Sequence, residues 1–313
     1  MSLSNFKTCE ICGSTDWVEA YRGDIRDGAF GAIRKDAVVA ECGTCGVQRL
    51  GEEWCIPDSY YETGEYRTHL KQELNTNAYF EKHDWLQKFA LQTIPLEKLR
   101  GKTIADIGCA GGSFLDHVHG IVNKVYAIEP CQEFHQGLKN RDYGVFPLPE
   151  HVSSDVHGTL DFAFSYQVIE HTADPKAFLQ SIRPLLKPDG VLYISTPNLR
   201  DILMSLLGDD YREFFYRVVH RWYFNADSLA QCARRAGFNI TNTHFVHRYN
   251  MANAMRWLRD KKPTGNVPEF PLDQMADQLW KGWTENAGVS DCLFMALESD
   301  PDFDPTRNVT AND

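Results

Sequence analysis

The sequence has no long apolar run and no cluster of basic residues. A membrane-spanning helix needs about 20 consecutive apolar residues, so we expect no membrane span. The formal net charge is −11, and nucleic-acid binding requires a positively charged surface, so we expect no nucleic-acid partner. The first ten residues, MSLSNFKTCE, lack a basic segment followed by an apolar one. We therefore expect no signal peptide and a cytoplasmic protein.

The composition is that of a folded protein, with 43% hydrophobic and 12% aromatic residues. A chain of 313 residues is long enough for one large domain or two smaller ones. The last segment, 300–313, is acidic and interrupted by proline, which predicts a disordered tail. Nothing in the sequence sets the oligomeric state.

Four of the nine cysteines form two matched pairs, each of the form C-x-x-C followed by glycine. Four thiolates suit tetrahedral Zn²⁺ and leave no position open, which is typical of a structural site. The gap between the pairs is longer than in most zinc ribbons, but the entropy of loop closure rises only slowly with length. The alternative is two unrelated thiol pairs or a redox pair. We expect a small N-terminal zinc module, with these ligands: Cys9, Cys12, Cys42 and Cys45.

Strand-like and helix-like patterns alternate from Lys102 onward, which predicts an α/β fold with a doubly wound, mostly parallel sheet. A helical pattern over about 75–92 precedes this region. The predicted strands are 102–108, 123–130, 143–148, a strand through Ser165, and 191–198. The helices between them begin near 113, 133 and 175, and the last of these is stopped by Pro188 and Gly190.

A glycine-rich turn, DIGCAGGSF, follows the first of these strands. In such sheets ligands bind at the carboxyl ends of strands. The dinucleotide fingerprint G-x-G-x-x-G is absent, and Asp106 stands two positions before Gly108, where an anion disfavours a pyrophosphate. A ligand with a cationic end suits this position better.

These segments resemble the class I S-adenosylmethionine-dependent methyltransferases. DIGCAGGSF is similar to their first motif, with Ala110 in place of the middle glycine, and YAIEP is similar to the second. LDFAFSYQVIEHTADP and LKPDGVLYISTPN match the fourth- and fifth-strand segments in the right order. The resemblance implies a seven-stranded Rossmann-like domain over 75–299, after a zinc module and tyrosine-rich linker over 1–74.

The resemblance also implies roles for individual residues. The methionine part of S-adenosylmethionine would lie on the first motif, Glu129 would bind the ribose, and Pro130 would lie close to the adenine. Phe146 to Leu148 lie where the family contacts adenine, although the usual acidic residue is missing. The implied cofactor contacts are Asp106, Gly108, Cys109, Ala110, Gly112, Glu129, Pro130, Leu148, Ser165 and Gln167.

Methyl transfer to a hydroxyl needs a base for the departing proton, and two histidines are candidates. His171 follows the fourth strand, and its alternative role is to brace the loop there. His220 lies in a later insert and alternatively packs beside Trp222. Glu170 is placed to orient either imidazole. Ubiquinone-pathway O-methyltransferases carry E-x-x-E-H here as part of a metal site, but Gln167 replaces the first carboxylate, and glutamine is a poorer ligand for a hard cation.

Aromatic and basic residues outside the motifs are candidates for the acceptor site. Tyrosines offer a ring for sugars, and arginines bind pyrophosphate; the alternatives are packing of the zinc module and solvated surface charge. Arg217 and Arg248 belong with the arginine candidates. The predicted acceptor contacts are Tyr60, Tyr61, Tyr66, Arg221 and Tyr223.

The layout of a cysteine-rich N-terminus, SYYETGEY and then this core is similar to zinc-containing sugar methyltransferases of deoxysugar and surface-polysaccharide pathways. This resemblance implies a nucleotide-linked sugar as acceptor, methylated on a hydroxyl or a ketosugar carbon. Two alternatives stay open: an RNA methyltransferase that uses the zinc module to hold RNA, and a catalytically silent cofactor-binding homologue.

Overall fold

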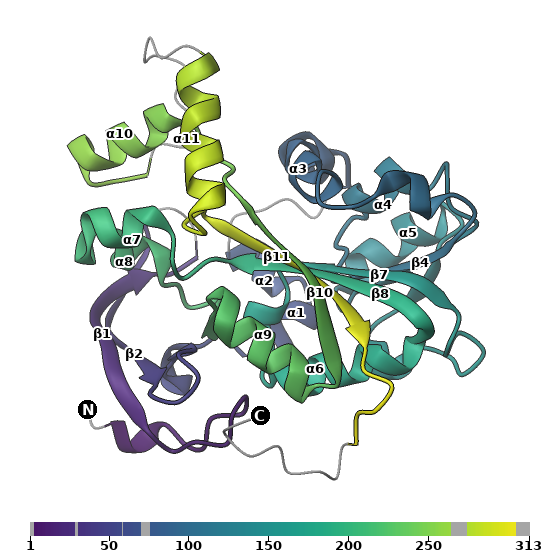
Figure 1. Ribbon diagram of the computed structural model, residues 1–313, viewed down its shortest axis with the longest axis horizontal. Coiled ribbons are helices and arrows are strands. Elements are labelled where there is room, and N and C mark those ends of the chain that lie inside the picture. Colours follow the sequence, from purple (N-terminus) through teal and green to yellow (C-terminus); the bar gives the residue numbers. More distant parts are fainter. Residues whose placement is uncertain (1–2, 29–30, 58, 70–75, 264–273, 305–313) are drawn as a thin grey trace.

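The computed structural model describes residues 3–28, 31–57, 59–69, 76–263 and 274–304. A seven-stranded sheet forms its centre, in the order β10-β11-β8-β7-β4-β5-β6 (Figure 1). β11 is antiparallel to both of its neighbours, and the other pairs are parallel. The predicted fold class is therefore confirmed. The strands are β4 (Thr103–Ile107), β5 (Lys124–Ile128), β6 (Gly144–Phe146), β7 (Leu160–Tyr166), β8 (Leu186–Pro197), β10 (Phe238–Val246) and β11 (Cys292–Ser299).

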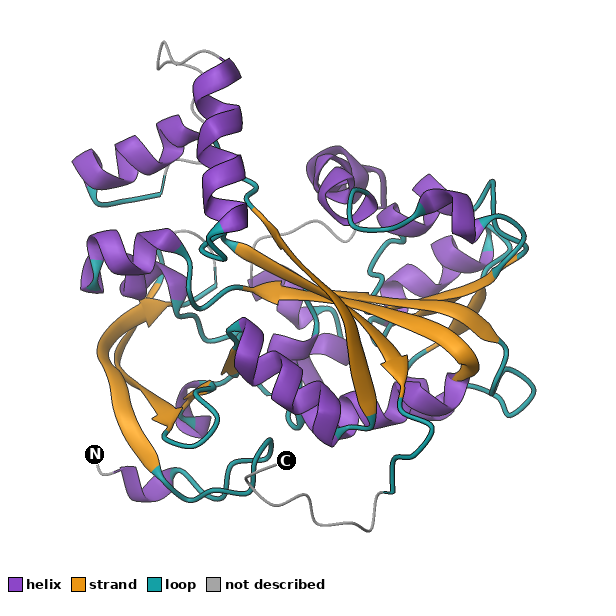
Figure 2. Ribbon diagram, viewed as in Figure 1, coloured by secondary structure: helices purple, strands orange, loops and turns teal. Residues whose placement is uncertain are grey.

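Helices cover both faces of this sheet, and each face has its own apolar core (Figure 2). On one face α3 (Thr76–Leu91), α4 (Ser113–Val118) and α5 (His135–Lys139) pack on a cluster that includes Phe164. On the other, α6 (Pro175–Ile182) and α9 (Ala226–Arg235) contribute Leu179 and Leu229. Burial on both faces explains why the central strands read as continuous apolar runs.

Helix α6 ends earlier than the sequence predicts. The pattern indicates a helix that continues to Pro188, but α6 ends at Ile182 and β8 begins at Leu186. Pro184 is the physical reason, because proline lacks the N–H that the helix needs and its ring clashes with the preceding turn. The predicted helical residues after it pair instead with β7, where Leu186 lies opposite Leu160.

The N-terminal region forms a second sheet of four strands, in the order β1-β2-β3-β9. Its fourth strand comes from the later part of the chain, so the sheet ties the two regions together. The strands are β1 (Trp17–Arg26), β2 (Ile33–Cys42), β3 (Gln48–Leu50) and β9 (Trp222–Tyr223). Two short helices, α1 (Ser59–Glu62) and α2 (Glu65–His69), occupy the segment that the sequence predicts as a polar linker.

The insert between β8 and β9 forms α7 (Ile202–Leu207) and α8 (Asp209–Phe215), which pack beside β1 (Figure 1). α10 (Met251–Asp260) and α11 (Gln274–Asn286) lie between β10 and β11 in the chain and project from the sheet. None of the helices in the described ranges is both long and apolar enough to cross a membrane. Of the predicted tail, 305–313 lie outside the described residues.

Candidate active site and metal centre

The turn after β4 brings the backbone close to its neighbours. Gly108 has a φ of +78°, and a Cβ there would lie 2.4 Å from Val168 Cγ2. Ala110 also adopts a left-handed backbone conformation, with a φ of 49°, which L-residues rarely adopt and which is found at functional sites. Glycine adopts this conformation without strain, whereas the Cβ of Ala110 makes it unfavourable. The turn therefore leaves no room for a side chain at Gly108, because Val168 already occupies that space.

The carboxylate of Glu129 is held at the end of β5 by two backbone amides. Oε2 accepts a hydrogen bond from Ala110 N at 2.6 Å, and Oε1 accepts one from Cys131 N at 2.9 Å. The residue is only 5% exposed. Each carboxylate oxygen keeps a second lone pair, so Glu129 can still accept bonds from a ligand's hydroxyls. Asp106 is buried nearby, and burial together with the charge of Glu129 raises its pKa to about 8.

A cavity of about 520 Å³ lies beside Glu129. Its walls combine this carboxylate with apolar side chains, which suits a ligand that carries both a diol and a flat ring. Tyr61 and His171 line this cavity, together with five of the predicted cofactor contacts. These five are Gly108, Glu129, Pro130, Leu148 and Gln167.

A second cavity, of about 420 Å³, lies on the other side of the turn. The two cavities share Gly108, Gln167 and His171. The second cavity is also lined by Glu170 and His220, which belong to the predicted catalytic set. The three predicted catalytic residues are therefore brought together at the place where the two cavities meet.

Gln167 sits at the junction with a strained backbone, at a φ of 58°. Its N–H donates to Ser195 O at 2.9 Å, and its Nε2 donates to Ser195 Oγ at 3.2 Å. These bonds fix the left-handed residue where the chain turns away from β7. The strain is thus balanced by the neighbouring strand β8.

Glu170 lies between the two histidines. Its Oε1 is 3.9 Å from His171 Nε2 and 4.0 Å from His220 Nε2. Both Glu170 oxygens are buried without a hydrogen-bond partner among the described residues. His171 Nδ1 lies 2.6 Å from Val219 O, so that nitrogen carries the proton and Nε2 is left with its lone pair. The three side chains offer ligand atoms within 4.8 Å of one another, a spacing at which a metal ion can bind.

The electrostatics of this group favour neutral side chains. Burial raises the pKa of Glu170 to about 7, against the opposing effect of the Arg217 and Arg248 charges. Burial, followed by the charge of Arg217, lowers the pKa of His220 well below its usual value. His220 is therefore an uncharged imidazole near neutral pH, which is the form a general base requires.

Three of the predicted acceptor contacts, Tyr60, Arg221 and Tyr223, line neither of these cavities. Arg221 is ion-paired with Glu52, and Tyr223 is buried with its hydroxyl on the backbone of Arg217. Tyr60 packs on the N-terminal core cluster, and the side chain of Tyr66 lies outside the described residues. Four predicted cofactor contacts are buried beneath the cavity walls or in the turn, with the Ser165 hydroxyl lacking a hydrogen-bond partner. These four are Asp106, Cys109, Gly112 and Ser165.

Several residues that line the second cavity were not found by sequence reasoning. They come from α3, β1, β11 and the N-terminus of α7, which are far apart in the chain, and no motif marks them. Arg26 is the last residue of β1, whose sequence, WVEAYRGDIR, carries no such signal. These residues include Arg26, Tyr79, His83, Asp201 and Phe294.

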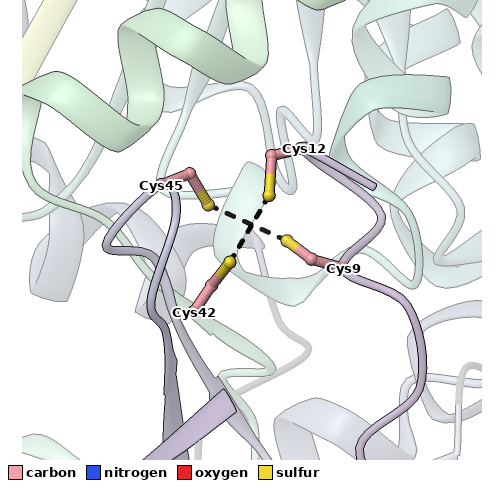
Figure 3. A group of neighbouring side chains, drawn as sticks. All are labelled: Cys9, Cys12, Cys42 and Cys45. Carbon is pink, nitrogen blue, oxygen red and sulfur yellow. Dashed lines mark hydrogen bonds between the residues drawn. The ribbon is translucent and has the colours of Figure 1, made fainter. Parts of the chain in front are cut away.

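The four cysteines of the N-terminal region come together as predicted (Figure 3). Cys9 Sγ lies 3.8 Å from Cys45 Sγ, and Cys12 Sγ lies 3.4 Å from Cys42 Sγ. A tetrahedral zinc with Zn–S bonds of about 2.3 Å requires thiolates about 3.8 Å apart. The donor set and its spacing therefore fit Zn²⁺, with two ligands from each C-x-x-C turn.

The comparisons with known proteins agree with this geometry. A family described as "Methyltransferase domain" matches residues 69–243, more than half of the chain. The chain belongs to this family. Residues 69–243 are a methyltransferase domain of the class I, S-adenosylmethionine-dependent type, and the cavity beside Glu129 fits the cofactor in its donor set and its apolar walls.

Curated relatives of the methyltransferase include two enzymes called ubiquinone biosynthesis O-methyltransferase. The one from Caulobacter vibrioides is 31% identical over 120 residues, which cover 36% of this chain and 48% of the relative. The mitochondrial one from Bos taurus is 26% identical over 229 residues, covering 64% of this chain and 61% of the relative. The matched segments thus span less than two thirds of either relative.

Two solved structures are similar to this chain. A chain from the complex between the Haloferax volcanii Trm112 methyltransferase activator and a methyltransferase aligns with a TM-score of 0.50 at 15% identity, covering 72% of this chain and 93% of that one. An S-adenosylmethionine-dependent methyltransferase from Archaeoglobus fulgidus gives a TM-score of 0.47 at 13% identity, covering 75% and 99%. The likeness to the first supports the fold alone.

Proposed function

We propose that the methyltransferase methylates a hydroxyl of a nucleotide-linked sugar in polysaccharide or glycoside biosynthesis, with a histidine as base. The observation that carries the proposal is the meeting of two cavities at Gly108, Gln167 and His171. One cavity fits the cofactor, and the other contains Glu170 and His220. A cofactor and an acceptor bound in the two cavities would therefore meet at this junction.

In this proposal the cofactor spans the turn after β4. Glu129 accepts hydrogen bonds from the ribose diol, and the apolar walls formed by Pro130 and Leu148 take the adenine. The methionine part lies over Gly108 and the turn that follows, above buried Asp106, and Ser165 and Gln167 lie under the methyl group. S-adenosylmethionine supplies an electrophilic methyl group on a sulfonium.

His220 takes the proton of the acceptor hydroxyl as its oxygen bonds to the methyl carbon. The carbon–sulfur bond breaks in the same step, and its electron pair stays on sulfur. Ionised Glu170, 4.0 Å from His220 Nε2, stabilises the imidazolium that forms. His171, held on Val219 O and beside Tyr61, fixes the geometry of the junction. Burial of the group excludes water that would compete for the base.

The zinc module extends over 1–74 in this proposal and supports the acceptor side of the methyltransferase domain, 75–299. Zn²⁺ held by the four cysteines would fix the turns at the base of β1 and β2, while β9 continues their sheet. The bound ion thus supplies rigidity and takes no part in methyl transfer, because four thiolates leave it no open position.

Release of S-adenosylhomocysteine tests the proposal. The enzyme is incubated with S-adenosylmethionine and, separately, with a pool of nucleotide-activated sugars and with total RNA. Turnover on the sugar pool alone supports the proposal. Turnover on RNA alone would replace it with RNA methylation, and cofactor binding without turnover on either pool would favour a silent homologue or another acceptor.

A second candidate is metal-assisted O-methylation, favoured by the spacing of Glu170, His171 and His220 within 4.8 Å. A divalent cation held there would lower the pKa of the acceptor hydroxyl directly. Adding Mg²⁺ or Mn²⁺ to metal-depleted enzyme should then raise turnover at least tenfold, and Glu170→Gln should abolish the increase. Turnover that is indifferent to these ions would leave the histidine as the base.

A further inference from the structure

Arg26 and Arg217 lie side by side although they are far apart in the chain. They form a parallel β-bridge: Arg26 N donates to Tyr216 O at 3.1 Å, and Val218 N donates to Arg26 O at 3.1 Å. The Tyr223 hydroxyl holds the backbone of Arg217, because it accepts a hydrogen bond from Arg217 N at 3.0 Å and donates one to Arg217 O at 3.1 Å. The backbone of both arginines is thus fixed by buried bonds.

Both side chains line the second cavity, and their charges are not neutralised there. Arg26 Nε and Arg217 Nε are buried without a hydrogen-bond partner, and neither guanidinium belongs to an ion pair within the described part of the chain. The guanidinium of Arg26 lies over the ring of Phe214, 4.3 Å from its centroid. A cation–π contact offsets only part of the cost of burying a guanidinium.

Two of the three carboxylates that line the same cavity are engaged elsewhere. Asp291 is ion-paired with Arg248 at 2.6 Å. Asp201 accepts from Tyr211 Oη at 2.6 Å and from the N–H of Leu203 at 3.0 Å. Glu170, the third carboxylate, lies between the two histidines. The two arginines are therefore left as a pair of like charges.

The pKa of Arg26 shows the cost of this arrangement. Burial, followed by the charge of Arg217, lowers the pKa of Arg26 to about 9. A bound anion removes this repulsion and fills the empty donor sites. Two guanidinium groups match a diphosphate in charge and in their forked geometry.

We propose that Arg26 and Arg217 form an anion subsite that binds the phosphoryl groups of the acceptor, so that the N-terminal module completes the acceptor site. That the anion belongs to the methylated molecule rests on the proposed function. The charges of both arginines act on His220, and Arg26 also lines a neighbouring cavity of about 380 Å³, which is walled by Tyr211 and Trp257 among others. A diphosphate here would leave the sugar hydroxyl near His220.

Inorganic pyrophosphate tests the subsite without any methyl transfer. Its binding to the full chain, saturated with S-adenosylhomocysteine, is measured by calorimetry for wild type, Arg26→Gln and Arg217→Gln. We expect each substitution to weaken pyrophosphate binding at least tenfold and to leave the affinity for S-adenosylhomocysteine within about twofold. Arg26→Lys keeps the charge but not the forked guanidinium group. Its affinity for pyrophosphate should lie between those of wild type and Arg26→Gln.

Arg22→Gln is the matched control, because Arg22 lies on the same strand and is paired with Glu19 at the surface. It should bind pyrophosphate as wild type does. Wild-type protein that does not bind pyrophosphate, or variants at both Arg26 and Arg217 that bind it normally, would overturn the subsite. Pyrophosphate binding that depends on both arginines, without turnover on nucleotide-activated sugars, would instead reject the proposed acceptor and leave the subsite in place.

Discussion

His220 Nε2 lies 4.0 Å from Glu170 Oε1, and both side chains are buried at the end of the second cavity. They come from different elements, since Glu170 follows β7 and His220 precedes β9. The N–H of Arg221 donates to Glu170 O at 2.8 Å, so the two loops are joined by their backbone. A carboxylate held beside an uncharged imidazole is the arrangement that base catalysis needs.

Glu129→Gln should weaken the binding of S-adenosylhomocysteine by about 10- to 100-fold. The charged carboxylate is lost, and hydrogen bonds to charged groups contribute about 1.5–3 kcal/mol. Calorimetry measures the dissociation constant. Glu150→Gln is the control, because Glu150 lines the same cavity but is exposed at its rim. Equal affinities for wild type and Glu129→Gln would remove Glu129 from the cofactor site.

Cofactor binding should release a proton from Asp106. With its pKa raised to about 8, this carboxyl is neutral at pH 7 in the free protein. A cationic ligand beside it favours the ionised form and lowers its pKa, so affinity should rise with pH up to about 8 and then level off. Calorimetry in buffers of different ionisation enthalpy measures the proton released. A release that persists in Asp106→Asn would contradict this assignment.

Cys42→Ser should release zinc and destabilise the N-terminal module, since the remaining three thiolates cannot complete a tetrahedral site. Metal content and thermal unfolding are the measurements. Cys55→Ser is the control, because Cys55 does not belong to the four-cysteine group. If Cys42→Ser retains one zinc per chain, the proposed ligand set is wrong.

The alternation of strands and helices predicted the central sheet because each central strand is a short apolar run bounded by turn residues. The zinc ligands were predictable for a similar reason, since spacing and residue type alone define a C-x-x-C pair. The end of α6 was misplaced because Pro184 was not given its weight as a helix breaker.

The acceptor side was predicted less well, because it is assembled from segments distant in the chain. Glu170 and His171 lie in a motif, but Arg26 reaches the cavity through a β-bridge that no local pattern announces. Arg221 looked equivalent to Arg217 in the sequence. Only the fold shows that Arg221 forms an ion pair with Glu52. Among the described residues, no acidic side chain forms an ion pair with Arg217.

The most direct test of the histidine-base mechanism is the turnover of His220→Ala, measured as S-adenosylhomocysteine release with nucleotide-activated sugars. Removing a general base costs about 10²- to 10⁴-fold in rate. We predict a loss of this size with cofactor affinity within a few-fold of wild type, and full activity in the control His157→Ala, whose side chain is exposed. Wild-type turnover by His220→Ala would contradict the account.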